Sequence, residues 1–234
     1  MIARYGADAT RMYALFAAPP DRDLEWQEDG VAGVSRFLSR VHRLTIKYSD
    51  AASQRHRASA SLAAQSVEGM ALLRKLHQTI AKITLDFSGR WHFNTCIAAI
   101  MELVNAILAN EAAMDAGEVS AATIAEVFRN LVLMLAPFAP FLAAELWETI
   151  GGEGAVFRVA WPHADKELAR ESEIEIPVQI NGKLASVVTV LAGSDEATIK
   201  AAALADAKIA ARLDGRAAAK IIVVPGKLVN LVVK

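Results

Sequence analysis

The sequence predicts a mainly α-helical bundle followed by a small α+β domain of β-β-α-β-β order. Apolar residues recur every three to four positions through residues 7–150, which is typical of packed amphipathic helices. From Ile174 onward they alternate instead, as in strands with one buried face. The 234 residues are 54% hydrophobic, enough to build a core and too many for a disordered chain. We expect a helical domain over 1–162, a charged linker over 163–173 and a second domain over 174–234.

The helical domain is predicted to consist of helices joined mostly by short connections, as in a bundle. The expected helices cover Ala7–Phe16, Val31–Tyr48 and Val67–Phe87, then begin at Phe93, begin at Ser120, and pass through Leu146 and Trp147. Residues 49–66 hold few large apolar groups and are expected to form a flexible connector. We also expect Leu24 and Trp26, in the loop before the second helix, to tuck under the helices.

Residues that start or stop helices support these boundaries. Pro19-Pro20 ends the first helix, because proline cannot continue the backbone hydrogen bonds. Ser120 is a favourable N-cap residue. Pro137 and Pro140 break the helix that follows it, and Gly151-Gly152 is a plausible stop for the last helix.

The second domain is predicted from two hairpins that flank one helix. Ile174 to Ile180 alternate strictly, Asn181-Gly182 favours a tight turn, and Leu184 to Val190 returns as a strand. An alanine-rich helix is expected from Ser194 to Leu213, and Asp214-Gly215 ends it. The second hairpin joins Ala219–Val224 to Leu228–Val233 through Pro225-Gly226.

The net charge of −1 conceals a basic segment. Residues 36–90 carry ten cations and three anions, a net charge of +7. On the helix Val31–Tyr48, one stripe is apolar and a second stripe holds Arg36, Arg40, Arg43 and Lys47. A row of cations on a rigid helix could contact the phosphates of a polyanion. Taken alone, the pattern favours the simpler interpretation of a solvated helix face.

The sequence holds no recognisable catalytic motif. It has neither a P-loop nor G-x-G-x-x-G, and one cysteine, Cys96, excludes an intrachain disulfide. His92 and Cys96 are four positions apart, but two residues do not complete a zinc site. Without a membrane span or a signal-peptide pattern, we expect a cytoplasmic protein that alone catalyses nothing.

Several blocks nevertheless resemble one enzyme family in order along the whole chain. They are Tyr5-Gly6-Ala7-Asp8, Phe16–Pro20, Leu24-Glu25-Trp26, Arg36-Phe37-Leu38, Phe93-Asn94-Thr95 with Ile97–Leu103, Leu135–Pro140, Glu145-Leu146-Trp147, Trp161-Pro162, Pro177-Val178-Gln179, Asn181-Gly182-Lys183, and Val224–Leu228 with Asn230-Leu231-Val232. The chain resembles the C-terminal portion of a bacterial-type leucyl-tRNA synthetase, after the KMSKS loop. The two hairpins of the tail favour the leucyl enzyme over its valyl and isoleucyl relatives.

The resemblance implies a class I synthetase anticodon-binding domain followed by the small C-terminal domain of that family. Its partners would be tRNA(Leu) and the upstream catalytic body of the same enzyme, with no membrane. The chain would position the tRNA for aminoacylation and editing performed by upstream domains. No cofactor is expected in this chain, because the parent enzyme uses ATP and Mg in those other domains.

The resemblance also suggests which residues contact RNA. The candidates are Arg36, Arg40, Arg43, Lys47, Lys82, Arg90, Asn94, Lys183, Arg216, Lys220, Lys227 and Asn230. Asn94 could equally be the N-cap of its helix. Ala185 and Val187 stand where the family usually has basic residues, which could shift RNA contacts to Arg212 and Arg216.

Three alternatives remain open on sequence alone. The chain could be a helical protein-interaction module whose cations are merely solvated. It could be the tRNA-binding portion of a valyl or isoleucyl synthetase, or one subunit of a naturally split enzyme.

Overall fold

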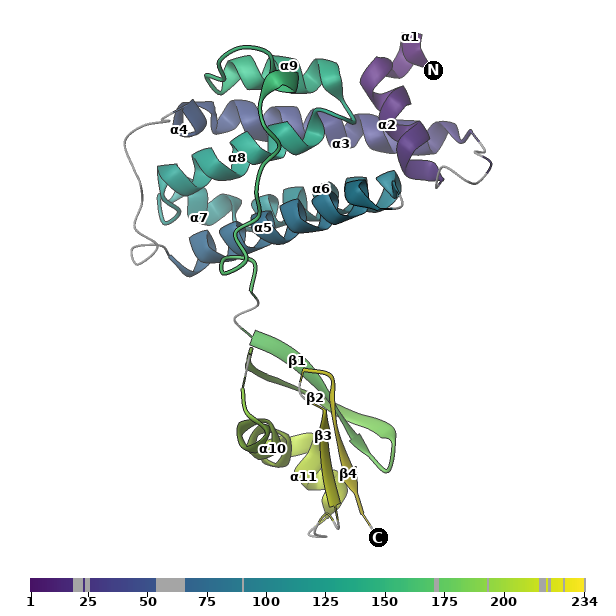
Figure 1. Cartoon of the computed structure of the whole chain (residues 1–234), viewed down its shortest axis with the longest axis vertical. Coiled ribbons are helices and arrows are strands. Elements are labelled where there is room, and N and C mark those ends of the chain that lie inside the picture. Colours follow the sequence, from purple (N-terminus) through teal and green to yellow (C-terminus); the bar gives the residue numbers. More distant parts are fainter. Residues whose placement is uncertain are drawn as a thin grey trace. The chain divides into compact units, whose positions relative to one another are not determined.

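The computed structural model describes every residue except 19–22, 24–25, 54–65, 90, 171–172, 193, 215–217, 219, 225 and 234. The chain divides into two compact units, Met1–Ala169 and Arg170–Lys234, which we call the helical unit and the sheet unit (Figure 1). Residues 163–169, which we expected in a linker, therefore belong to the helical unit.

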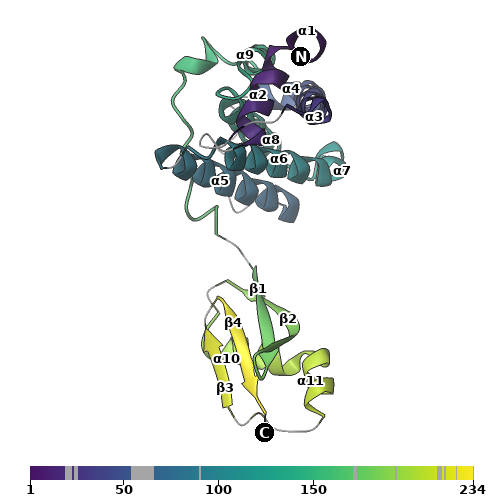
Figure 2. The same cartoon turned by 90° about the vertical axis from the view of Figure 1, so that its right-hand side faces the viewer.

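The helical unit is a bundle of long helices with short helices at their ends. Its elements are α1 (Ile2–Tyr5), α2 (Ala7–Ala17), α3 (Glu28–Lys47), α4 (Ser49–Ser53), α5 (Val67–Ser88), α6 (Phe93–Ala109), α7 (Glu111–Asp115), α8 (Ala121–Leu135), α9 (Pro140–Thr149) and the 3-10 helix η2 (Val156–Arg158). Helices α5 and α6 run side by side, as Figures 1 and 2 both show. The predicted helices are confirmed, with boundaries shifted by a few residues.

The helix ends follow the residues that predicted them. The Ser120 side chain accepts a hydrogen bond from the Thr123 N–H and caps α8. Pro140 is the first residue of α9, where its missing N–H costs nothing. After α9, Gly151 takes φ 70°, and a Cβ on Gly152 would overlap the indole ring of Trp147.

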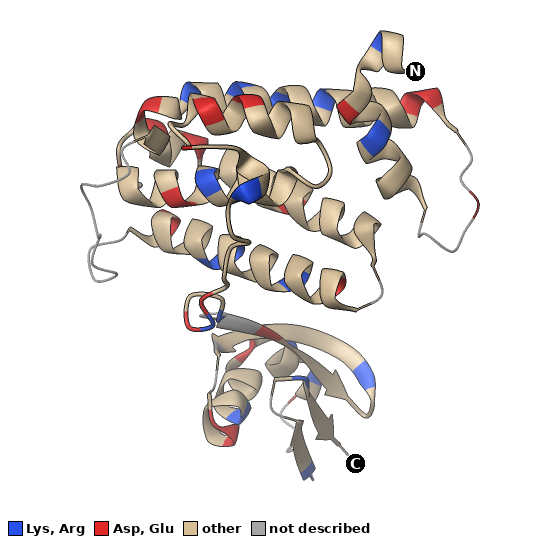
Figure 3. Ribbon diagram, turned by 45° about the horizontal axis from the view of Figure 1, so that its top comes forward, with Lys and Arg blue, Asp and Glu red and all other residues tan. Residues whose placement is uncertain are grey.

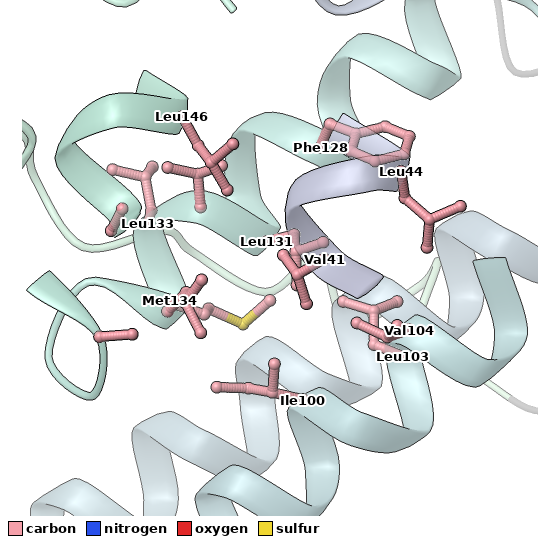
Figure 4. Close-up of a cluster of buried hydrophobic side chains, with 14 of the residues drawn as sticks. Val41, Leu44, Ile100, Leu103, Val104, Phe128, Leu131, Leu133, Met134 and Leu146 are labelled. Carbon is pink, nitrogen blue, oxygen red and sulfur yellow. The ribbon is translucent and has the colours of Figure 1, made fainter. Parts of the chain in front are cut away.

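One buried core holds the bundle together. Figure 4 shows side chains from α3, α6, α8 and α9 pointing toward one another. Val41 and Leu44 of α3 meet Leu103 of α6 and Phe128 of α8, and all four are fully buried. Burial of this apolar stripe fixes which side of α3 faces inward.

Two local predictions for the helical unit need correction. An additional helix, α1, precedes α2, and the two are separated at Gly6, whose φ of 84° suits a residue without a Cβ. Trp26 does not tuck away: it packs against Tyr13 at 5.3 Å between ring centroids yet stays 49% exposed. Leu24, Pro19-Pro20 and most of the expected connector lie outside the described residues.

The sheet unit contains a four-stranded sheet of order β2-β1-β4-β3 with two helices. Its elements are β1 (Glu173–Ile180), β2 (Lys183–Leu191), α10 (Glu196–Ala205), α11 (Ala207–Leu213), β3 (Lys220–Val224) and β4 (Leu228–Val232). Each hairpin is antiparallel, and the two hairpins join through parallel pairing of β1 with β4. Asn181 and Gly182 both take positive φ, the geometry expected of an Asn-Gly hairpin turn.

The single helix predicted between the hairpins is divided in two. Asp206 adopts an extended conformation after α10, and its carboxylate accepts a hydrogen bond from the Ile209 N–H at the start of α11. Both helices contribute to the core of this unit, through Ile199 and Ile209. Asp214 then ends α11 in the left-handed conformation, as expected of a helix stop.

Candidate nucleic-acid interface

Helix α3 carries the row of cations predicted from the sequence. Its buried stripe faces the core, and Arg36, Arg40, Arg43 and Lys47 are all exposed. Figure 3 shows basic positions recurring along its ribbon. The predicted two-sided character of this helix is therefore present, but the four cations have different surroundings.

The C-terminal half of the row is engaged by acidic residues of α7. Lys47 Nζ lies 2.7 Å from Asp115 Oδ2 and 2.8 Å from Glu111 Oε1. Arg43 lies 3.7 Å from the same Glu111 oxygen. The Tyr48 hydroxyl donates a 2.7 Å hydrogen bond to Asp115 Oδ1. These contacts tie the end of α3 to α7 and neutralise two of the four predicted phosphate contacts.

The pKa values follow from this network. Hydrogen bonds to Asp115 and Glu111 raise the pKa of Lys47. Hydrogen bonds from Lys47 and Tyr48 hold the pKa of Asp115 below its usual value. Burial, and then the bond to Asp115, raise the pKa of the Tyr48 phenol. At neutral pH, Lys47 and Asp115 therefore face each other fully charged.

The N-terminal half of the row is different. Within the part of the chain that the structure describes, no carboxylate lies within ion-pair distance of Arg36 or Arg40. Both side chains are exposed. Arg36 and Arg40 thus remain available for an anionic ligand such as an RNA phosphate.

The candidates near the α5–α6 turn are also constrained. Lys82 pairs with Asp86 at 3.0 Å, and the Thr95 hydroxyl donates to the same carboxylate at 2.6 Å. Asn94 is not an N-cap: that position belongs to His92, and Asn94 lies within the first turn of α6. Its Oδ1 atom is buried, and no described residue forms a hydrogen bond with it. Arg90 lies outside the described residues.

In the sheet unit, three predicted lysines are exposed and one asparagine is structural. Lys183, Lys220 and Lys227 reach solvent at strand ends and turns. Asn230 Oδ1 instead accepts a 3.0 Å hydrogen bond from the Gly182 N–H, so it links β4 to the first hairpin. Asn181 makes the reciprocal link through two hydrogen bonds to the Val233 backbone.

The departures from the family pattern have distinct environments. Ala185 is buried in the sheet core, whereas Val187 is 47% exposed. Arg212 donates from its guanidinium to the Leu184 carbonyl at 3.3 Å, so it already supports the first hairpin. Arg216, the other suggested substitute, lies outside the described residues.

Sequence reasoning missed a groove of about 700 Å³ between α1, α2, α3 and α9. It is lined by Tyr5, Ser39, His42, Phe141 and Glu145 among others, and His42 Nε2 lies 3.5 Å from Glu145 Oε1. Phe141 is 72% exposed at its edge. No local sequence pattern predicts this groove, because its walls come from segments more than 100 residues apart.

A long-range cap fixes one wall of the groove. The Asp8 carboxylate accepts hydrogen bonds from the Phe141 and Leu142 N–H groups, at 3.3 and 2.7 Å. These donors are unpaired at the N-terminus of α9, where a negative charge is favourable. Asp8, part of the Tyr5–Asp8 block, therefore fastens α2 to α9.

The described residues do not assemble a metal centre or membrane span. No group of three His, Cys, Asp or Glu side chains among them could hold a metal ion. Cys96 is buried, and burial raises the pKa of its thiol to about 11. No helix in the described chain combines the length and apolar character needed to cross a bilayer.

Comparisons with known proteins place these features in one family. A family model for the anticodon-binding domain of tRNA ligases matches residues 70–201, more than half of the chain. The leucine–tRNA ligase of Solibacter usitatus is 46% identical over 234 residues, covering 99% of this chain and 27% of that protein. The leucine–tRNA ligase of Geotalea daltonii is 46% identical over 233 residues, covering 100% and 28%. The chain thus spans little more than a quarter of these relatives.

A solved structure is similar over the same extent. It is the ternary complex of Agrobacterium radiobacter K84 agnB2 LeuRS with tRNA and LeuAMS, with a TM-score of 0.86 and 32% identity. The similarity covers 100% of this chain and 30% of that one. The order of helices and strands, the family model and the relatives agree: this chain belongs to the anticodon-binding domain family of tRNA ligases, in its leucine–tRNA ligase branch.

Proposed function

We propose that the chain binds tRNA(Leu) and positions it for aminoacylation and editing carried out by other parts of a leucine–tRNA ligase. The observation that carries this proposal is the similarity of the whole chain to a synthetase solved with tRNA bound.

The exposed cations supply the physical basis. Arg36 and Arg40 lie one helical turn apart on a rigid helix, so both can meet phosphates along one RNA strand. Lys183, Lys220 and Lys227 offer further exposed charges on the sheet unit. Phosphate contacts of this kind fix the register and orientation of RNA without reading its sequence. The mechanism is therefore positioning.

The remaining partner is the catalytic body of the same ligase. Because the chain spans 27–28% of its leucine–tRNA ligase relatives, we assign leucine activation, with its ATP and Mg, to the rest of such an enzyme. The complete enzyme would act in the cytoplasm, where translation takes place.

A salt titration tests the proposal. The chain is titrated with leucine tRNA at several salt concentrations, and the affinity should fall with a log–log slope of about −0.7 to −0.9 per phosphate contacted. A tRNA for another amino acid and a double-stranded DNA of equal length serve as controls. Absence of binding at low salt, or binding that ignores salt, would instead favour the helical protein-interaction module.

A further inference from the structure

The last residues of the helical unit are held along α5 by specific hydrogen bonds. The Trp161 indole N–H donates to Thr84 Oγ1 at 2.8 Å. The Asp165 N–H donates to His77 Nδ1 at 3.1 Å, and Gln78 Nε2 donates to the Ala169 carbonyl at 3.1 Å. We call the contacts of His77 and Gln78 with residues 165–169 the exit clamp.

The exit clamp is built on a fixed helix. His77 is only 5% exposed, between the fully buried Leu76 and Ile80 of α5. Because its Nδ1 atom accepts a hydrogen bond, the ring proton must lie on Nε2. That nitrogen is 3.2 Å from Glu126 Oε1 of α8, at ion-pair distance but outside hydrogen-bond geometry. The imidazole therefore links α5 to the exit segment through the hydrogen bond at Nδ1.

The clamped segment has its own internal order. Asp165 Oδ1 accepts hydrogen bonds from the N–H groups of Glu167 and Leu168, at 2.8 and 3.3 Å. The Ala169 N–H donates to the Asp165 carbonyl at 3.0 Å, which closes a turn. Ala164 packs against the core of the helical unit. Hydrogen bonds and apolar contact thus hold residues that the sequence alone predicts to be a linker.

We propose that His77 and Gln78 are positioning residues that fix the point where the chain leaves the helical unit, and so keep the sheet unit close to a shared RNA. The inference rests on the proposed function, since it requires both units to contact one tRNA. With the clamp closed, positions 170–172 alone separate the helical unit from β1. With the clamp open, the connection would extend back to Ala164, which packs against the core of the helical unit.

The expected gain from the clamp can be calculated. A connection lengthened from three to about eight residues lowers the effective concentration of the second unit about fourfold, by the −3/2 power dependence on length. The Kd for leucine tRNA should therefore rise about fourfold when the clamp is opened, without loss of any residue proposed to contact RNA.

The test uses the full chain carrying His77→Leu and Gln78→Ala, with His77→Asn as the matched control. Asparagine Oδ1 can accept the Asp165 N–H in place of Nδ1, whereas leucine cannot. The first readout is trypsin cleavage after Lys166, which is exposed but lies within the clamped turn. This cleavage should accelerate in the His77→Leu/Gln78→Ala variant and stay slow in His77→Asn. Cleavage after Lys227, in the sheet unit, should not change.

The second readout is tRNA affinity in two backgrounds. In the native background, opening the clamp should weaken binding about fourfold. In a background that also carries Lys183→Ser, Lys220→Ser and Lys227→Ser, opening the clamp should not change the tRNA affinity, because the sheet unit no longer contributes to binding. Thermal melting identifies any variant that has lost its fold, and Gln78→Ala alone then replaces the double variant.

The outcomes separate the two proposals. Faster cleavage together with background-dependent weakening supports the clamp as a positioning device. Unchanged cleavage in a folded clamp variant overturns it, and so does faster cleavage with unchanged tRNA affinity; in both cases RNA binding by the native chain keeps the proposed function intact. Failure of the native chain to bind tRNA overturns the proposed function and the positioning role with it.

Discussion

The two halves of α3 look equivalent in sequence but differ in the folded chain. Arg36 and Arg40 are exposed, and no carboxylate among the described residues pairs with them. Arg43 and Lys47, one and two turns further along, are neutralised by Glu111 and Asp115 of α7. One half of the helix therefore presents charge outward, and the other half uses charge to attach a neighbouring helix.

The difference shows what a charge pattern can and cannot predict. Helical spacing fixes which side of α3 a cation occupies, because the buried stripe fixes the orientation of the helix. Whether that cation is free depends on acidic residues that approach from elsewhere in the chain. Here the acids lie more than 60 residues away in sequence. Arg36 and Arg40 are therefore cations without acidic partners among the described residues, whereas RNA contacts by Arg43 and Lys47 would compete with Glu111 and Asp115.

The sharpest way to test this difference is to remove each pair of cations in turn. Arg36→Ser with Arg40→Ser should weaken leucine tRNA binding about 20-fold at 0.15 M salt, as expected for two phosphate contacts. The matched control, Arg43→Ser with Lys47→Ser, removes the same charge and should weaken binding much less. Fluorescence titration measures both. Equal losses in the two variants would show that the α7 acids do not sequester their partners from RNA.

The complementary experiment removes the acidic partners of Arg43 and Lys47. Glu111→Gln with Asp115→Asn should release Arg43 and Lys47 and strengthen leucine tRNA binding about fivefold. The gain should vanish when Arg43→Ser and Lys47→Ser are added. The same titration, repeated at high salt as a control, measures the effect. Unchanged or weaker binding would mean that the C-terminal half of α3 does not face RNA.

A smaller effect should appear in the pH dependence of stability. In the folded chain the pKa of Asp115 lies below its ordinary value of 3.8. The ionised carboxylate therefore stabilises the fold above pH 3.8, and this stabilisation is lost as the pH falls through the folded pKa. Asp115→Asn should therefore lower the Tm at pH 7, and the difference from the native chain should close below about pH 3.8. Thermal melts followed by circular dichroism at several pH values measure this Tm difference. Arg36→Ser should show no such pH-dependent difference.

Elements defined by neighbouring residues were predictable from the sequence. Ser120 caps α8, α8 ends before Pro137 and Pro140, and Asn181-Gly182 turns between β1 and β2, as expected. In each case the decisive interaction spans only a few positions. Local rules for caps, prolines and turns therefore predicted most helices and strands, but not helix α1, the division between α10 and α11, or the parallel pairing of β1 with β4.

Interactions between distant residues were not predictable in the same way. Asp8 caps α9 across more than 130 positions, and His77 holds Asp165 across 88. The latter hydrogen bond is one contact that attaches the charged stretch 163–169 to the helical unit. For the candidate site, the sequence predicted the exposed Arg36 and Arg40, but could not predict that Lys47 has acidic partners. Residues such as Arg90 and Arg216 remain predictions.

The arrangement of the small sheet has a consequence for how the protein is made. β4 lies between β1 and β3, although it follows both of them in the sequence. The hydrogen bonds between Asn181 and Val233 and between Gly182 and Asn230 can form only after that strand has emerged from the ribosome. The helices of the first unit need nothing from this strand to bury their core. The helical unit should therefore fold first during synthesis, and the sheet should form only once β4 can pair with β1 and β3.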